Sequence, residues 1–84
     1  MDSIERRLLV QLSAASDRLI ALLQYRVEGW SFSKQDIVIR STMEVIDTLR
    51  SVLELQPILN TRELTMCEWK RFPVISENEF LKMI

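Results

Sequence analysis

Residues that break helices are almost absent from this chain. Its 84 residues include one glycine, Gly29, and two prolines, Pro57 and Pro73. Glycine and proline are the strongest local interruptions of regular structure, so their scarcity leaves a few long segments, which favour helices. The sequence shows no repeats, low-complexity stretches or Gly/Ser linkers. We therefore expect residues 1–84 to form a single domain.

The first segment places apolar side chains on one helical face. They recur at steps of mostly three and four, in the order Ile4, Leu8, Leu12, Ala15, Leu19, Leu22 and Leu23. Asp2 and Glu5 have the spacing of a capping box, and Gly29 can adopt the left-handed conformation that often ends a helix. The pattern predicts a helix over about 3–29.

The second segment begins with a stronger start signal. Ser33 can accept hydrogen bonds from first-turn amides, Asp36 follows three residues later, and Phe32 can pack onto Ile37. An apolar seam with flanking positions follows: Val38, Thr42, Val45, Leu49 and Val52, with Ile39, Ile46 and Leu53. We expect a helix over about 33–55, although a short strand competes in the β-branched run that begins at Ile37.

Two short helices are predicted near the C-terminal end. Asn60 and Ser76 each have a glutamate three residues later and apolar residues that flank the signal. Pro57 interrupts the second long helix because proline lacks the amide proton. We expect helices over about 60–72 and 76–84. The fold class is then all-α, a small helical bundle built on a long antiparallel helical hairpin.

The apolar face of the first helix is wider than one neighbouring helix needs. Leu9, Ile20 and Val27 extend the stripe to nearly half of the circumference. At about 1.5 Å per residue, the long helices would measure roughly 39 and 30 Å, and the C-terminal helices would cover about half of that length. We expect a homodimer or a heteromeric protein partner to cover the rest. The alternative is a closed monomeric four-helix bundle.

Aromatic residues beside basic ones suggest a binding surface. Trp30 and Phe32 flank the only glycine, and Trp69 to Phe72 enclose Lys70 and Arg71. Tryptophan, tyrosine and arginine are enriched at binding hot spots. The predicted interface comprises Leu9, Leu12, Ile20, Leu23, Val27, Trp30, Phe32, Trp69 and Phe72. The alternative is that the aromatic residues close the two ends of the bundle.

The sequence lacks the residues on which several common kinds of catalysis depend. There is no histidine, the commonest general base and metal ligand, and the single cysteine has no imidazole to activate it. A single glycine excludes a glycine-rich phosphate loop. We expect Cys67 to be a small buried apolar residue. We therefore expect that the protein is not an enzyme and that it uses no cofactor, metal or evident small-molecule substrate.

Two fragments resemble the pattern of bacterial-type chorismate mutases, which are small helical dimers. The fragments are the stretch from Asp17 to Arg26 and the pair Arg62 and Glu63. The resemblance implies that Arg26 and Arg62 converge on one pocket. However, Gly29 breaks what is one long first helix in that family, and the two arginines are too far apart in sequence for its pattern. Such an enzyme is the remote alternative.

Charge is balanced along the chain. There are 11 basic and 12 acidic residues, a net charge of −1, with the basic residues scattered among the acidic ones. Affinity for nucleic acid grows with the number of phosphates that are neutralised, so nucleic acid is a disfavoured partner. A small dimeric DNA-binding or nucleoid-associated regulator that uses Arg62, Lys70 and Arg71 is the second hypothesis.

The first hypothesis is a non-enzymatic protein–protein interaction module of the adaptor, chaperone or inhibitor type. It would bury an apolar helical face against a second copy or a partner protein. The sequence has a charged beginning without a secretory signal, one cysteine, and no apolar run of roughly 20 residues. We therefore expect a cytoplasmic location and no membrane segment.

Overall fold

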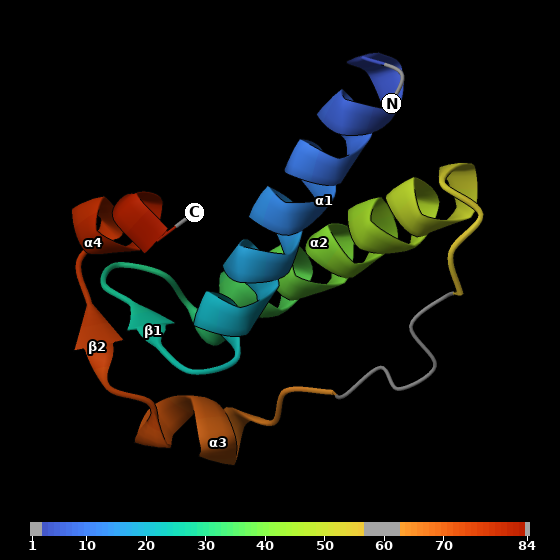
Figure 1. The fold of residues 1–84 in the computed structure, drawn as a ribbon. Coiled ribbons are helices and arrows are strands. Elements are labelled where there is room, and N and C mark those ends of the chain that lie inside the picture. Colours follow the sequence, from blue (N-terminus) through green and yellow to red (C-terminus); the bar gives the residue numbers. More distant parts are fainter. Residues whose placement is uncertain (1–2, 57–62, 84) are drawn as a thin grey trace.

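Two long antiparallel helices dominate the computed structural model, which describes residues 3–56 and 63–83 (Figure 1). The elements in chain order are α1 (Ser3–Leu22), β1 (Arg26–Val27), α2 (Phe32–Val52), α3 (Met66–Arg71), β2 (Val74–Ile75) and α4 (Glu77–Met83). The all-α class, the hairpin and the short C-terminal helices are as predicted. Two minimal strands were not predicted.

The hairpin is held by two apolar clusters. The first lies midway along the long helices and contains Leu12, Ala15, Ile46 and Leu49, with Leu8 and Leu53 packed against it. The second lies near the connection between the helices and contains Ala21, Leu22, Val27, Ile39, Leu64, Ile75 and Phe80. The C-terminal segments contribute only to the second cluster. Beyond the first cluster, the start of α1 and the end of α2 diverge (Figure 1).

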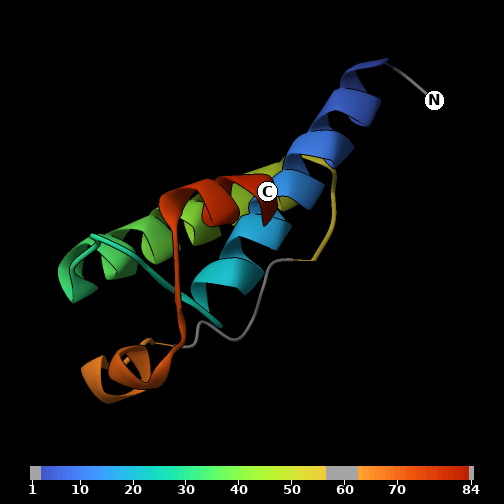
Figure 2. The ribbon, with the colours of Figure 1, turned by 90° about the vertical axis from the view of Figure 1, so that its left-hand side faces the viewer.

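The molecule is thin for its length. Its principal extents are 42 × 27 × 15 Å, and the shortest is little more than one helix diameter of about 10–12 Å. Figure 2 shows α4 beside the hairpin, toward its closed end, and α3 below that end. The helix α3 has no buried residue, and Phe80 is the buried residue of α4. The short helices therefore cover one end of the hairpin and leave its other end open.

Helix α1 ends at Leu22, seven residues before the predicted end. The cause is Gln35 on α2, whose side chain is fully buried. Its Nε2 donates to the carbonyl oxygens of Leu22 and Tyr25 at 2.9 and 2.8 Å. These carbonyls would otherwise lack partners at the end of a helix. A long-range side-chain contact therefore satisfies the helix end and lets the chain turn away.

The residues after α1 form a strand rather than two more helical turns. Arg26 N–H donates to Pro73 O at 2.9 Å, and Glu28 N–H donates to Ile75 O at 2.8 Å, in a parallel pairing of β1 with β2. Gly29 has a φ of 84° but does not cap α1. It lies in a turn that is closed by the Trp30 N–H bond to Val27 O at 3.1 Å.

Helix α2 begins and ends slightly earlier than predicted. Ser31, not Ser33, is the N-cap, and its Oγ accepts from Lys34 N–H at 3.1 Å. Asp36 instead accepts from Arg40 Nε at 3.1 Å, one turn further along the helix. The segment that begins at Ile37 is helical, so the competing strand does not form. The helix ends at Val52 and not near residue 55.

The third helix is shorter than predicted and the fourth is nearly as predicted. Asn60, the expected N-cap of the third helix, lies outside the described residues. So does Asp2, the expected start signal of the first helix. Residues 63–65 are not helical, and α3 begins after Thr65, whose Oγ1 accepts from Glu68 N–H at 3.2 Å. The predicted cap of α4 is confirmed, because Ser76 Oγ accepts from Glu79 N–H at 3.1 Å.

Candidate functional site

An apolar groove lies where the two long helices diverge. We call it the open-end groove, and its lining residues are Ile4, Glu5, Leu8, Leu9, Val52, Leu53, Glu54 and Leu55. Its volume is about 460 Å³. Ile4 is 63% exposed and Val52 is 61% exposed, although both are large apolar residues. Leu8 and Leu53 form the part of the groove that meets the hairpin core.

The last turn of α2 shapes one wall of this groove. Leu55 N–H donates to Arg50 O at 2.7 Å, and Glu54 N–H donates to Ser51 O at 3.1 Å. These two hydrogen bonds form the pattern that closes many helix ends through a residue in the left-handed conformation. Here that residue is Glu54, with a φ of 60°, and not a glycine. The reversal places Glu54 and Leu55 in the groove lining.

The charged residues of the open-end groove are both acidic. Glu5 and Glu54 are the ionisable residues of its lining, and both are exposed. Neither carboxylate forms an ion pair that involves another described residue. The groove therefore combines an apolar floor with negative charge at its edges. Such a surface is suited to an apolar segment that carries positive charge at its margins.

An exposed stripe without charged residues runs along α2 and reaches the groove. Its members, which we call the α2 stripe, are Ile37, Ser41, Val45, Thr48 and Val52, and all five are exposed. Their spacing of four, four, three and four residues places them on one side of the helix. The sequence pattern predicted one apolar seam for Val45, Leu49 and Val52. In the structure Leu49 faces the core, whereas Val45 and Val52 face outward.

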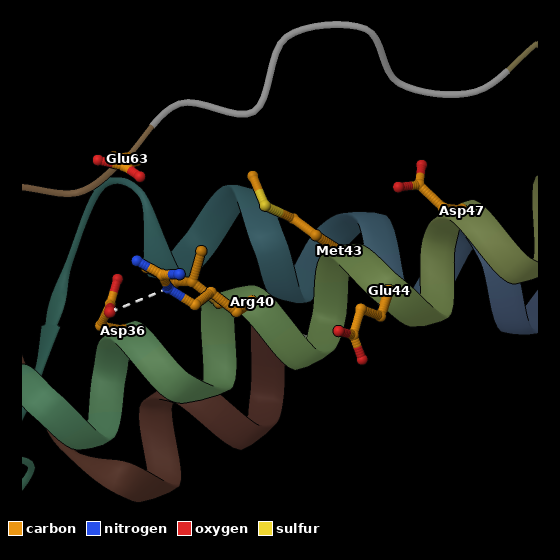
Figure 3. Close-up of a pocket in the computed structure, with 7 residues that line it drawn as sticks. Asp36, Arg40, Met43, Glu44, Asp47 and Glu63 are labelled. Carbon is orange, nitrogen blue, oxygen red and sulfur yellow. Dashed lines mark hydrogen bonds and ion pairs between the residues drawn. The ribbon is translucent and has the colours of Figure 1, made fainter.

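A second depression has an acidic lining. It has a volume of about 290 Å³ and is lined by Asp36, Ile39, Arg40, Met43, Glu44, Asp47 and Glu63. Figure 3 shows Glu63 across from the α2 side chains, with Asp36 paired to Arg40. Over the described ranges, no group of His, Cys, Asp or Glu side chains is arranged to hold a metal ion. We call this depression the acidic groove.

The aromatic residues at the closed end pack on one another and on the core. The rings of Trp30 and Phe80 meet edge to face at 5.5 Å, and those of Phe32 and Trp69 at 5.9 Å. The Arg26 guanidinium lies over the Trp69 ring at 4.9 Å from its centroid. This closed-end cluster holds α3 and the β1–β2 pair against the hairpin. The aromatic residues therefore close the bundle at one end, and not at two ends as the alternative expected.

The nine predicted interface residues do not lie on one surface. Leu12 and Val27 are core residues, and Leu23, Trp30, Phe32, Trp69 and Phe72 are half-buried against the closed-end core. Leu9 and Ile20 are exposed on α1, and only Leu9 lines the open-end groove. Val52, Glu54 and Leu55 also line the groove and were not among the predicted interface residues. The end of α2 was hard to locate because Glu54 is an unusual left-handed residue.

Other candidate residues are placed as follows. Cys67 is exposed, which contradicts its predicted burial, because it lies on a short helix without buried side chains. Arg26 contacts Trp69, and Arg62 lies outside the described residues, so their convergence is not tested. Among the described helices, none is both long and apolar enough to span a bilayer.

Comparison with protein-family models, with curated proteins and with solved structures finds no match to this chain.

Proposed function

We propose that this protein is a non-enzymatic protein–protein interaction module that binds its partner at the open-end groove. The observation that carries the proposal is the exposure of Ile4, Leu9, Val52 and Leu55 around one concave, apolar surface. An apolar patch gathered in a concavity is typical of interaction sites, whereas scattered exposed apolar residues are not.

The α2 stripe supports the same proposal. It meets the groove at Val52, so a bound segment could leave the groove and continue along α2. Helix-in-groove recognition uses an apolar face with anchors at this spacing. The absence of charge from the stripe lowers the desolvation cost of covering it. An adaptor, a chaperone or an inhibitor could each use such a surface.

The DNA-binding hypothesis has less support. Lys70 and Arg71 are on α3, which has six residues and carries Glu68 in its first turn. Glu63 lines the acidic groove just before this helix. Phosphate binding needs several cations on one face, and here Lys70 and Arg71 are flanked in sequence by Glu63, Glu68, Glu77 and Glu79.

Site-specific photo-crosslinking in native-host cells tests the proposed function. A photoreactive amino acid at Val52 should give a defined adduct with a protein partner, or with a second copy of this chain. The same group at Glu44, which is exposed elsewhere on α2, should give little of that adduct.

A groove variant supplies the specificity control. Replacing Leu9 and Leu55 by serine should remove the Val52 adduct and leave the circular dichroism spectrum unchanged, because both side chains are already exposed. Equal adducts from Val52 and Glu44, or an adduct that persists in the serine variant, would contradict binding at the groove.

A further inference from the structure

We infer that the open-end groove selects a basic amphipathic helix of another protein, and not a second copy of this chain. The inference rests on the proposed function and adds the chemistry of the partner. Three observations support it: the groove is lined by acidic but no basic residues, Glu54 stands in an unfavourable backbone conformation, and the acidic lining disfavours a symmetric dimer.

The charge of the groove restricts its ligand. Its apolar lining comes from α1 and from the end of α2, and Glu5 and Glu54 add carboxylates from each side. No lysine or arginine is among the lining residues. A helix with an apolar face flanked by Lys or Arg would bury its apolar residues between these carboxylates and place its cations beside them. An acidic helix would be repelled.

Glu54 is unfavourable where it stands. A left-handed backbone conformation disfavours residues other than glycine, and a carboxylate near the C-terminal end of a helix faces the negative end of the helix dipole. Its side chain makes no hydrogen bond to another described residue. The backbone turn closes α2, but a glutamate side chain adds cost there without a compensating bond to a described residue, and such local costs are typical of positions that serve binding. This supports a ligand contact for the Glu54 carboxylate.

The same charges disfavour a symmetric dimer through this surface. A two-fold axis brings the same patch of both protomers together, so four carboxylates and no lining lysine or arginine would share one interface. Arginines of α1 do not relieve this repulsion. Arg6 and Arg7 line a separate depression with Val10, about half a helical turn away from the groove face of α1. A two-fold contact centred on the groove would therefore leave these arginines away from its centre.

Peptide titrations test the charge selection. The probes are two amphipathic peptides of about 14 residues, a length near which isolated helices begin to form, with the same leucine face and with either lysine or glutamate elsewhere. Fluorescence anisotropy should show binding of the lysine peptide at least about tenfold tighter than that of the glutamate peptide. A protein with Glu5→Lys and Glu54→Lys should reverse this preference.

A charge-matched control separates the groove from general attraction. Glu44→Lys with Glu63→Lys makes the same change in net charge at the acidic groove. It should leave the affinity for the lysine peptide within about threefold of the wild-type value, since exposed charges far from a contact are screened by salt. If the control variant loses as much affinity for the lysine peptide as the Glu5→Lys, Glu54→Lys variant, the peptide does not bind specifically at the groove and the inference is overturned.

Other outcomes separate the inference from the proposed function. Equal binding of both peptides, abolished by the Leu9 and Leu55 serine changes, would overturn charge selection and leave the groove as an interaction site. Self-association in sedimentation equilibrium that the serine changes abolish would overturn the inference in favour of a second copy. If neither peptide binds, the protein does not self-associate and Val52 gives no adduct, both proposals are wrong.

Discussion

The indole Nε1 of Trp69 donates a hydrogen bond to the side-chain Oε1 of Gln35 at 3.0 Å. The bond joins residues 34 positions apart and connects α3 to the buried face of α2. The same Gln35 amide binds the end of α1 through its nitrogen, and Val27 N–H makes a longer contact of 3.5 Å with its oxygen. One side chain thereby connects three segments of the closed end.

Replacing Gln35 by methionine should lower the free energy of unfolding by about 3 kcal/mol. The change keeps the length of the side chain but leaves buried backbone carbonyls and the Trp69 indole without their partner, at about 1–3 kcal/mol for each such group. Urea unfolding followed by circular dichroism measures the loss. Gln11→Met on the exposed face of α1 is the control and should change stability little. Similar effects at both positions would contradict this role of Gln35.

Replacing Glu54 by glycine should raise the free energy of unfolding by about 1 kcal/mol. Glycine adopts a positive φ without the steric cost that Glu54 bears, and it removes a carboxylate from a helix C-terminus. The matched substitution Glu44→Gly lies inside α2 and should lower the free energy of unfolding by about 1 kcal/mol. Changes of the same sign at the two sites would exclude strain at Glu54.

Replacing Ser76 by alanine should destabilise the protein by about 1 kcal/mol, because Glu79 N–H loses its capping oxygen. Ser41→Ala is the control, since Ser41 is exposed within α2 and alanine is the better helix former. Thermal unfolding should give a lower midpoint for Ser76→Ala only. A lower midpoint in both variants would show that the serine change itself, and not the cap, is responsible.

Cys67 should react readily while the protein is folded. An exposed thiol on α3 is open to reagents, whereas a buried thiol reacts only as the protein opens. Ellman's reagent under native conditions should label it at a rate close to that in denaturant. Labelling that is slower by orders of magnitude would support the burial expected from the sequence.

Local signals in the sequence were enough for the hairpin and for the last helix. The apolar periods of α1 and α2 continue over many turns, and the Ser76 cap depends on a contact only three residues long. Such features need no knowledge of distant segments, so the all-α class, the hairpin and the start of α4 followed from the sequence.

The closed end depends on contacts that no local pattern contains. Gln35 meets Leu22 across 13 residues, and β1 pairs with a strand far along the chain. One signal was available, because Gln35 lies a turn before Ile39 on the buried side of α2. A polar residue there requires buried partners, and the end of α1 supplies them.

The groove was predicted only as an excess of apolar surface. Its position follows from the divergence of the helices beyond the Leu12 and Ile46 cluster and from the left-handed backbone at Glu54. Neither feature has a recognisable pattern in the sequence. The wide apolar stripe on α1 led to the prediction of Ile20 and Val27 as interface residues. The end of α2 instead supplies half of the residues that line the groove.

Amide chemical-shift mapping tests most directly whether the open-end groove is the binding surface. Titration of the lysine peptide into ¹⁵N-labelled protein should shift the amides of residues 3–9 and 52–55 first, and those along the α2 stripe to a smaller extent. Shifts confined to residues 36–47 and 63, around the acidic groove, would contradict the account.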